Sequence, residues 1–109
     1  MTDSGRWDRL AADLTEAGFN AKVDAKPYQD IYLGRPRCGF TRSITLRVPG
    51  RGLVEISDKW WVKNPDIWVG WTVNAENTES FLVGCAPRAS KNRRETVTAV
   101  KAALARLGA

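Results

Sequence analysis

The sequence predicts an α+β fold in which an antiparallel sheet of about five or six strands is flanked by an N-terminal and a C-terminal helix. Apolar residues recur at helical spacing near both ends of the chain, whereas the middle alternates between apolar and polar residues as strands do. Gly and Pro clusters separate the alternating segments, which is typical of short antiparallel connections. Because two amphipathic helices need an apolar surface to cover, we expect both helices on one face of the sheet.

The first helix should begin after Asp3 or Ser4, either of which can cap it, and should end at Ala17. Gly18 then follows as a left-handed cap. A short strand is expected over residues 19–24, where apolar and polar residues alternate. The apolar stripe of the helix consists of Trp7, Leu10, Ala11, Leu14 and Ala17.

The next segments predict a strand, a loop and a hairpin. A second strand should start after Pro27, and residues 34–39, which contain Gly, Pro and Arg, predict a turn or loop. The clearest alternation follows, and residues 40–58 should form an antiparallel hairpin around a turn at residues 49–52.

Two further strands and a helix complete the predicted sheet and its cover. Alternation over residues 67–74 and an apolar run over residues 81–85 indicate the strands. The final helix should start near Asn92, which has capping-box spacing with Glu95, and continue to Leu107.

Composition indicates one domain, residues 1–109, of ordinary globular character. No apolar run approaches the roughly 20 residues that span a bilayer and no hydrophobic signal core opens the chain, so we expect a cytoplasmic protein without a membrane segment. Cys38 and Cys85 could pair, but a reducing cytoplasm favours free thiols. The chain has no histidine, so we expect no dedicated metal site, no cofactor and no enzyme of the histidine-dependent triad or dyad type.

Charge is segregated along the chain. Residues 31–54 hold five arginines and no acid, and residues 88–109 hold six basic residues and one acid, so each segment has a net charge of +5. The remaining segments, residues 1–30 and 55–87, are net acidic. The chain as a whole carries +5, which favours an anionic partner.

Four tryptophans, Trp60, Trp61, Trp68 and Trp71, cannot all lie on one face of a strand. If the helices cover the face that bears Trp71, Trp61 and Trp68 lie on the opposite face or form a second small core under a loop. The opposite face would carry Tyr32, Ser43, Thr45, Arg47, Glu55, Ser57, Trp61 and Trp68. For a protein partner, Tyr32, Trp61 and Trp68 would supply contact area, and Arg42 and Arg47 would orient acidic groups.

Basic residues also crowd the start of the last helix, where Arg88, Lys91, Arg93 and Arg94 surround free backbone amides. Two interpretations of this cluster remain open. The basic residues either belong to a solvated loop or bind an anion such as phosphate or an acidic side chain of a protein. The alternative function is therefore nucleic-acid binding, in which the aromatic residues stack on bases. The residues that would neutralise phosphates are Arg35, Arg37, Arg51, Arg88, Lys91, Arg93 and Arg94.

The stretch from Ser90 to Leu107, in which Lys91, Arg93 and Arg94 precede an alanine-rich helix, resembles the second helix of double-stranded RNA-binding domains. The resemblance implies that these residues contact phosphates. It covers less than a fifth of the chain, and the segment between the helices is much longer than that family's three-stranded sheet.

In its excess of arginine over lysine and its alanine-rich helix ends, the chain also resembles small orphan proteins of actinobacteria and their phages. This resemblance rests on composition and implies an accessory protein that acts by binding. We therefore expect a non-enzymatic module that binds an unknown protein partner, for which the basic residues favour an acidic one. Self-association through the sheet or its edges is a further possibility.

Overall fold

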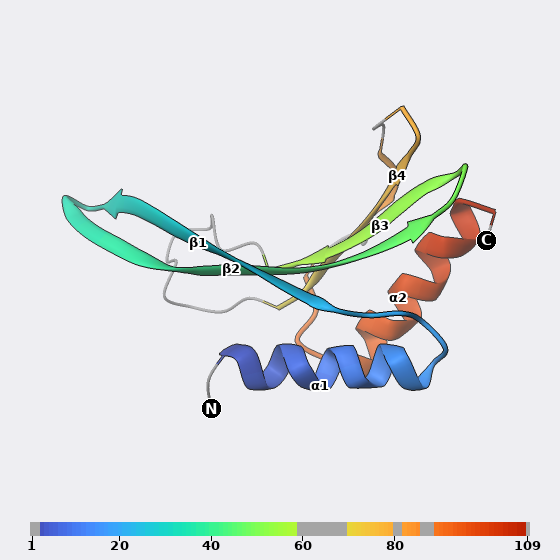
Figure 1. Cartoon of the computed structure of the whole chain (residues 1–109), viewed down its shortest axis with the longest axis horizontal. Helices are drawn as coiled ribbons and strands as arrows, with labels where there is room; N and C mark the ends of the chain where they lie inside the picture. The colour runs from blue at the N-terminus through green and yellow to red at the C-terminus, as the bar shows by residue number, and fades with distance from the viewer. Residues whose placement is uncertain (1–2, 59–69, 80–81, 86–88, 109) are drawn as a thin grey trace.

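Two helices lie on one face of a five-stranded antiparallel sheet in the computed structural model, which describes residues 3–58, 70–79, 82–85 and 89–108 (Figure 1). The strands are in sequence order from β1 to β5. The predicted α+β class, with a helix at each end of the chain and both helices on the same face, is confirmed. The elements are α1 (Asp3–Glu16), β1 (Val23–Tyr32), β2 (Arg35–Val48), β3 (Gly52–Ser57), β4 (Thr72–Asn77), β5 (Leu82–Cys85) and α2 (Arg93–Arg106).

Helix α1 buries Trp7, Leu10 and Leu14 fully, as its apolar stripe predicts, but Ala17 is exposed. The predicted start is wrong, because Asp3 and Ser4 lie within the helix and do not precede it as caps. Gly18 ends it with a φ of 98°, a conformation that favours glycine. The Gly18 amide donates to the Thr15 carbonyl, and the next amide donates to the Leu14 carbonyl. This pair of hydrogen bonds is a Schellman motif, which satisfies carbonyls that the helix end would otherwise leave free.

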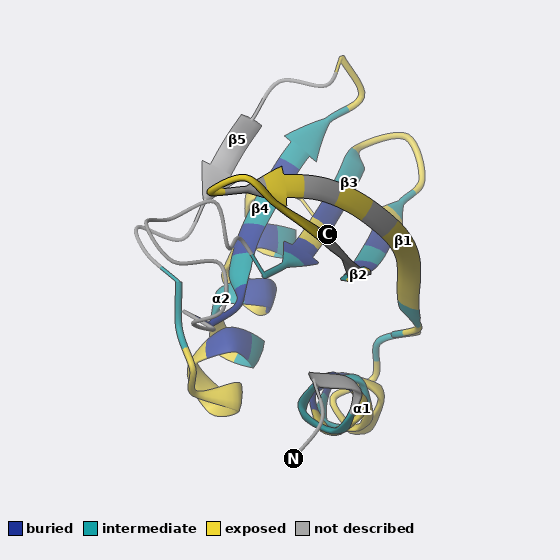
Figure 2. Cartoon of the chain, turned by 90° about the vertical axis from the view of Figure 1, so that its left-hand side faces the viewer, coloured by how far each residue is buried: buried dark blue, intermediate teal, exposed yellow. Residues whose placement is uncertain are grey.

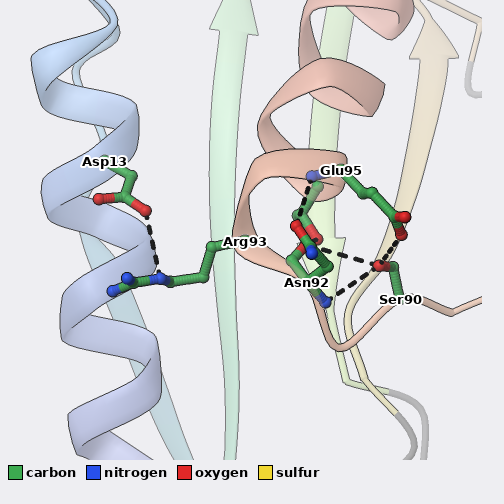
Figure 3. Close-up of polar contacts among 6 residues, drawn as sticks. Asp13, Ser90, Asn92, Arg93 and Glu95 are labelled. Atoms are coloured by element: carbon green, nitrogen blue, oxygen red, sulfur yellow. Dashed lines mark hydrogen bonds and ion pairs between the residues drawn. The ribbon is translucent and has the colours of Figure 1, made fainter.

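Helix α2 begins at the predicted cap. The Asn92 side chain accepts a hydrogen bond from the Glu95 amide at 3.0 Å. The Glu95 carboxylate accepts from the Ser90 hydroxyl at 2.7 Å, and Ser90 in turn accepts from the Asn92 amide at 3.1 Å (Figure 3). A serine two residues before the cap therefore connects the two partners of the predicted capping box.

The loop predicted over residues 34–39 is wrong, because Arg35–Val48 is one strand. The turn contains only Leu33 and Gly34, with φ of 51° and 75°, and Tyr32 pairs with Arg35. The strand predicted after Pro27 belongs to β1, whereas only Val23 and Asp24 of the strand predicted over residues 19–24 are in it. Positive φ at both turn residues matches the twist of a two-residue hairpin. Proline is tolerated because β1 is an edge strand.

The core lies between the helices and the alternating buried residues of β2, β3 and β4. Ile44, Leu46, Val54, Ile56, Val73 and Ala75 face the helices. Trp7 of α1 meets Trp71 edge to face, with ring centroids 6.1 Å apart and an interplanar angle of 82°. Its indole nitrogen also donates to Asp58 at 3.2 Å, which ties α1 to the end of β3. Trp71 thus lies on the helix-covered face, as predicted.

Strands β1 and β2 continue beyond the helix layer as a two-stranded ribbon. Strand β3 pairs with β2 only from Ser43 to Val48, whereas β1 pairs with β2 as far as Arg35. We call residues 24–42 the β1–β2 arm. Figure 1 shows the arm extending past the N-terminal end of α1, and Figure 2, which looks toward the arm, shows much of it exposed.

Candidate functional site

The β1–β2 arm has two faces, which follow from strand alternation. Directly opposed residues of antiparallel strands point to the same face, and alternate residues of one strand share that face. Because Ile44 is buried against the helices, Arg42 and Phe40 lie on the same face of β2. Pro27 of β1, the partner of Phe40, lies there too. We call this the helix-side face of the sheet and the opposite one the outer face.

The helix-side face of the arm is apolar and exposed. Ile31 retains 75% of its accessible surface and Phe40 58%. Large apolar side chains exposed on one face are typical of interaction sites in soluble proteins, and an isolated two-stranded hairpin is marginally stable in water. The exposed apolar residues on this face are Ala25, Pro27, Ile31, Pro36 and Phe40.

The tip of the arm is unusual in its turn chemistry. Leu33 has a φ of 51° and is 84% exposed, next to Gly34 with a φ of 75°. A left-handed conformation costs an L-residue other than glycine roughly 1–2 kcal/mol, and Asn or Asp usually occupies this turn position. The tip therefore combines backbone strain with an exposed aliphatic side chain, a combination that indicates a functional position.

The base of the arm carries a paired aromatic ring and cation. The Arg42 guanidinium carbon lies 6.0 Å from the centroid of the Phe40 ring. Arg42 is partly buried, whereas Phe40 is exposed. This distance is within the range of cation–π interactions, so Phe40 restrains the arginine beside the apolar surface.

The outer face is mainly polar where it is described, with Leu53 as an apolar exception. Strand pairing and burial place Ser43, Thr45, Arg47, Glu55 and Ser57 on it, as the sequence predicts. The Ser57 hydroxyl and the Thr72 hydroxyl of the next strand are hydrogen-bonded at 3.1 Å. This face of the described sheet presents hydroxyl, amide and charged groups.

The predicted partner-binding residues are not brought together. Arg42 lies on the helix-side face and Arg47 on the outer face, because an odd number of positions separates them along one strand. Trp61 and Trp68 lie outside the described residues, and so does the side chain of Tyr32, although its backbone belongs to β1. The surface proposed from sequence is therefore divided between two faces.

The basic residues predicted to contact nucleic acid are also dispersed. Arg35 begins β2 and Arg51 follows its other end, so roughly 40 Å of strand separates them. The Arg51 guanidinium donates to the Leu107 carbonyl at 3.5 Å, at the C-terminus of α2. The Arg37 side chain and all of Arg88 lie outside the described residues.

The other basic group lines a cleft of about 880 Å³ between α1 and α2. Arg93 pairs with Asp13 of α1 at 3.3 Å (Figure 3). Glu16 also lines the cleft, together with Lys91, Arg94 and Lys101. One interpretation of the sequence is that an external anion contacts these basic residues. In the structure Asp13 and Glu16 of the protein itself lie beside part of them.

Sequence reasoning missed the arm residues Ile31, Leu33 and Phe40, which it treated as ordinary strand residues. Alternating apolar residues on both sides of Leu33–Gly34 could have indicated a hairpin. The Gly and Pro residues in the same stretch favoured a loop instead.

Among the described residues, no group of three or more Cys, Asp or Glu side chains is placed to hold a metal ion. No helix in the described part of the chain is long and apolar enough to cross a membrane. Scans of protein-family models, curated proteins and solved structures found no match to this chain.

Proposed function

We propose that this protein is a non-enzymatic interaction module that binds a protein partner through the β1–β2 arm. The observation that carries the proposal is the exposure of three large apolar side chains, Ile31, Leu33 and Phe40, on a ribbon that extends beyond the helix layer. By contrast, the buried apolar side chains of the described residues form one core between the helices and the sheet.

The energetics of burial support a binding role. Full burial of one such side chain contributes about 1.5–3 kcal/mol, so covering the exposed parts of all three contributes roughly 3–6 kcal/mol. Part of this offsets the loss of translational and rotational freedom on association. The arm can therefore contribute most of the affinity of a transient complex without large changes elsewhere in the domain.

The distribution of charge favours a protein partner over nucleic acid. A phosphate backbone is bound by cations that line a continuous path. Here Arg35 and Arg51 lie at opposite ends of β2, Arg51 contacts the end of α2, and Arg93 is paired with Asp13. The apolar character of the arm's helix-side face is also more typical of protein interfaces, whose buried centres are depleted of charge.

The proposal is tested with a photo-crosslinking amino acid placed at position 33 in cells that naturally make the protein. We expect a crosslink to one specific protein from position 33 and none from position 101, an exposed position on α2. The crosslink should be lost when Phe40→Ser is combined with the probe at position 33. Equal crosslinking from both positions, or crosslinking that survives Phe40→Ser, would refute the arm as the binding surface.

A further inference from the structure

Phe40 and Arg42 form a pair that is suited to more than apolar contact. They are alternate residues of β2 on the helix-side face, with the guanidinium carbon 6.0 Å from the ring centroid. Contact with the ring restricts the long arginine side chain, so less conformational entropy is lost when its planar group binds. The pair thus presents a restrained cation at the border of an apolar surface.

The guanidinium of Arg42 lacks a carboxylate partner among the described residues. Of the two acidic residues next to it, Asp24 of β1 pairs with Ser43 and so lies on the outer face, and Asp58, which follows β3, accepts a hydrogen bond from the Trp7 indole N–H. A guanidinium has five N–H donors in a planar fork that matches a carboxylate in a two-bond geometry. Partial burial strengthens such an interaction relative to one in bulk water.

Addition of a strand to the edge of β1 is a less suitable use of the arm. In an antiparallel pair, alternate residues direct their backbone groups toward the neighbouring strand or away from it. Pro27 has no N–H, so it occupies a position that faces the open edge and removes one donor there. Proline on an edge strand opposes pairing with another chain.

A second copy of the chain is opposed by charge. The arm contains Lys26, Arg35, Arg37 and Arg42 against two aspartates, a net charge of +2. Two arms packed face to face would bring two Arg42 guanidinium groups into the interface, and by strand alternation the helix-side face of the arm carries no acidic residue to pair with either. Nucleic acid fits this face poorly as well, because Arg35 lies on the outer face, opposite to Arg42. An acidic protein segment complements both the apolar residues and the cation.

We infer that the helix-side face of the arm receives a protein segment in which an aromatic or aliphatic side chain lies next to an Asp or Glu. Phe40 and its cross-strand partner Pro27 contact the apolar side chain, and Arg42 binds the carboxylate. This inference rests on the proposed function and specifies the chemistry of the partner.

The test selects random 12-residue peptides, displayed on phage, for binding to the full-length protein. We expect enrichment of peptides that carry Asp or Glu beside an aromatic or aliphatic residue. The affinity of the most enriched peptide is then measured by fluorescence anisotropy with Arg42→Glu, Phe40→Ser and the matched control Arg47→Glu. Arg47 lies on the same strand and undergoes the same charge change, but on the outer face.

Arg42→Glu and Phe40→Ser should each weaken binding by about tenfold or more, as truncation of a central contact does. Arg47→Glu should change it by no more than about twofold, which is the screened effect of a distant charge. Changing the peptide's acidic residue to its amide should weaken binding to the natural protein and to Arg47→Glu, but not to Arg42→Gln. Circular dichroism of each variant confirms that the fold is retained.

Other results overturn the inference in distinguishable ways. Peptides that require Phe40 but bind Arg42→Gln equally well would remove the carboxylate contact and leave the proposed function intact. If no peptide is enriched, or if the enriched peptides bind independently of every arm variant, both proposals fail. A dimer that forms with rising concentration and disappears in Phe40→Ser would make the occupant a second copy. Binding of mixed-sequence DNA that is lost in Arg42→Glu would make it a nucleic acid.

Discussion

The turn at the tip of the arm makes a sharp prediction about stability. Leu33 is held at a φ of 51° and is 84% exposed, so its side chain contributes little burial while its backbone is strained. Leu33→Asn should relieve that strain, because Asn tolerates the left-handed region and Asn-Gly is the preferred sequence for this two-residue turn. The substitution should therefore stabilise the folded protein.

The magnitude follows from the left-handed conformation. Relief of most of a roughly 1–2 kcal/mol penalty should raise the free energy of unfolding by about 1 kcal/mol. For a domain of this size that corresponds to a rise of roughly 4 °C in Tm. Thermal unfolding followed by circular dichroism resolves such a difference, and urea unfolding gives the free energy directly.

Leu33→Ala is the matched control. It removes almost the same exposed apolar surface but keeps a residue that is penalised at positive φ, so it should not raise Tm. If Leu33→Asn is no more stable than Leu33→Ala, the turn is not a source of strain and the reasoning from its φ is wrong. Under the proposed function, both variants should weaken partner binding, because the aliphatic side chain at the tip is lost in each.

Three further substitutions test how the domain is held together. Gly52→Ala should lower the free energy of unfolding by about 2 kcal/mol or more, because the φ of 140° is strained for alanine and its Cβ would collide with the Glu76 carbonyl. A urea midpoint unchanged from the natural protein would contradict this close approach. Asp58→Ala should lower the free energy of unfolding by about 1–3 kcal/mol, because it leaves the Trp7 indole N–H in α1 without its acceptor. An unchanged Tm in calorimetry would mean that water replaces the carboxylate. Arg93→Ala should change the free energy of unfolding by less than about 1 kcal/mol, because the side chains of Arg93 and Asp13 are 44% and 37% exposed. A larger loss in chemical denaturation would contradict the interpretation of this contact as an ordinary surface ion pair.

Both helices, the end of α1 at Gly18 and the start of α2 at Asn92 could be predicted from local sequence alone. A stripe such as Trp7, Leu10 and Leu14 is buried wherever the helix packs, because helical periodicity places these side chains on one side. Gly18 and Asn92 act within a single turn of chain, so their roles do not depend on distant residues. The alternation of Ile44 and Leu46 likewise determined which face of β2 meets the core.

The arm depended on contacts that local sequence does not encode. Gly and Pro content around residues 34–39 indicated a loop, but pairing with β1 made the segment a strand, since strand hydrogen bonds form between segments and override local preference. Phe40 alternates in register with Ile44, and its sequence pattern is that of a core residue. Phe40 is exposed, and β3 pairs with β2 only from Ser43 onward. Only the lengths and packing of the elements in three dimensions decide where the cover of a sheet stops.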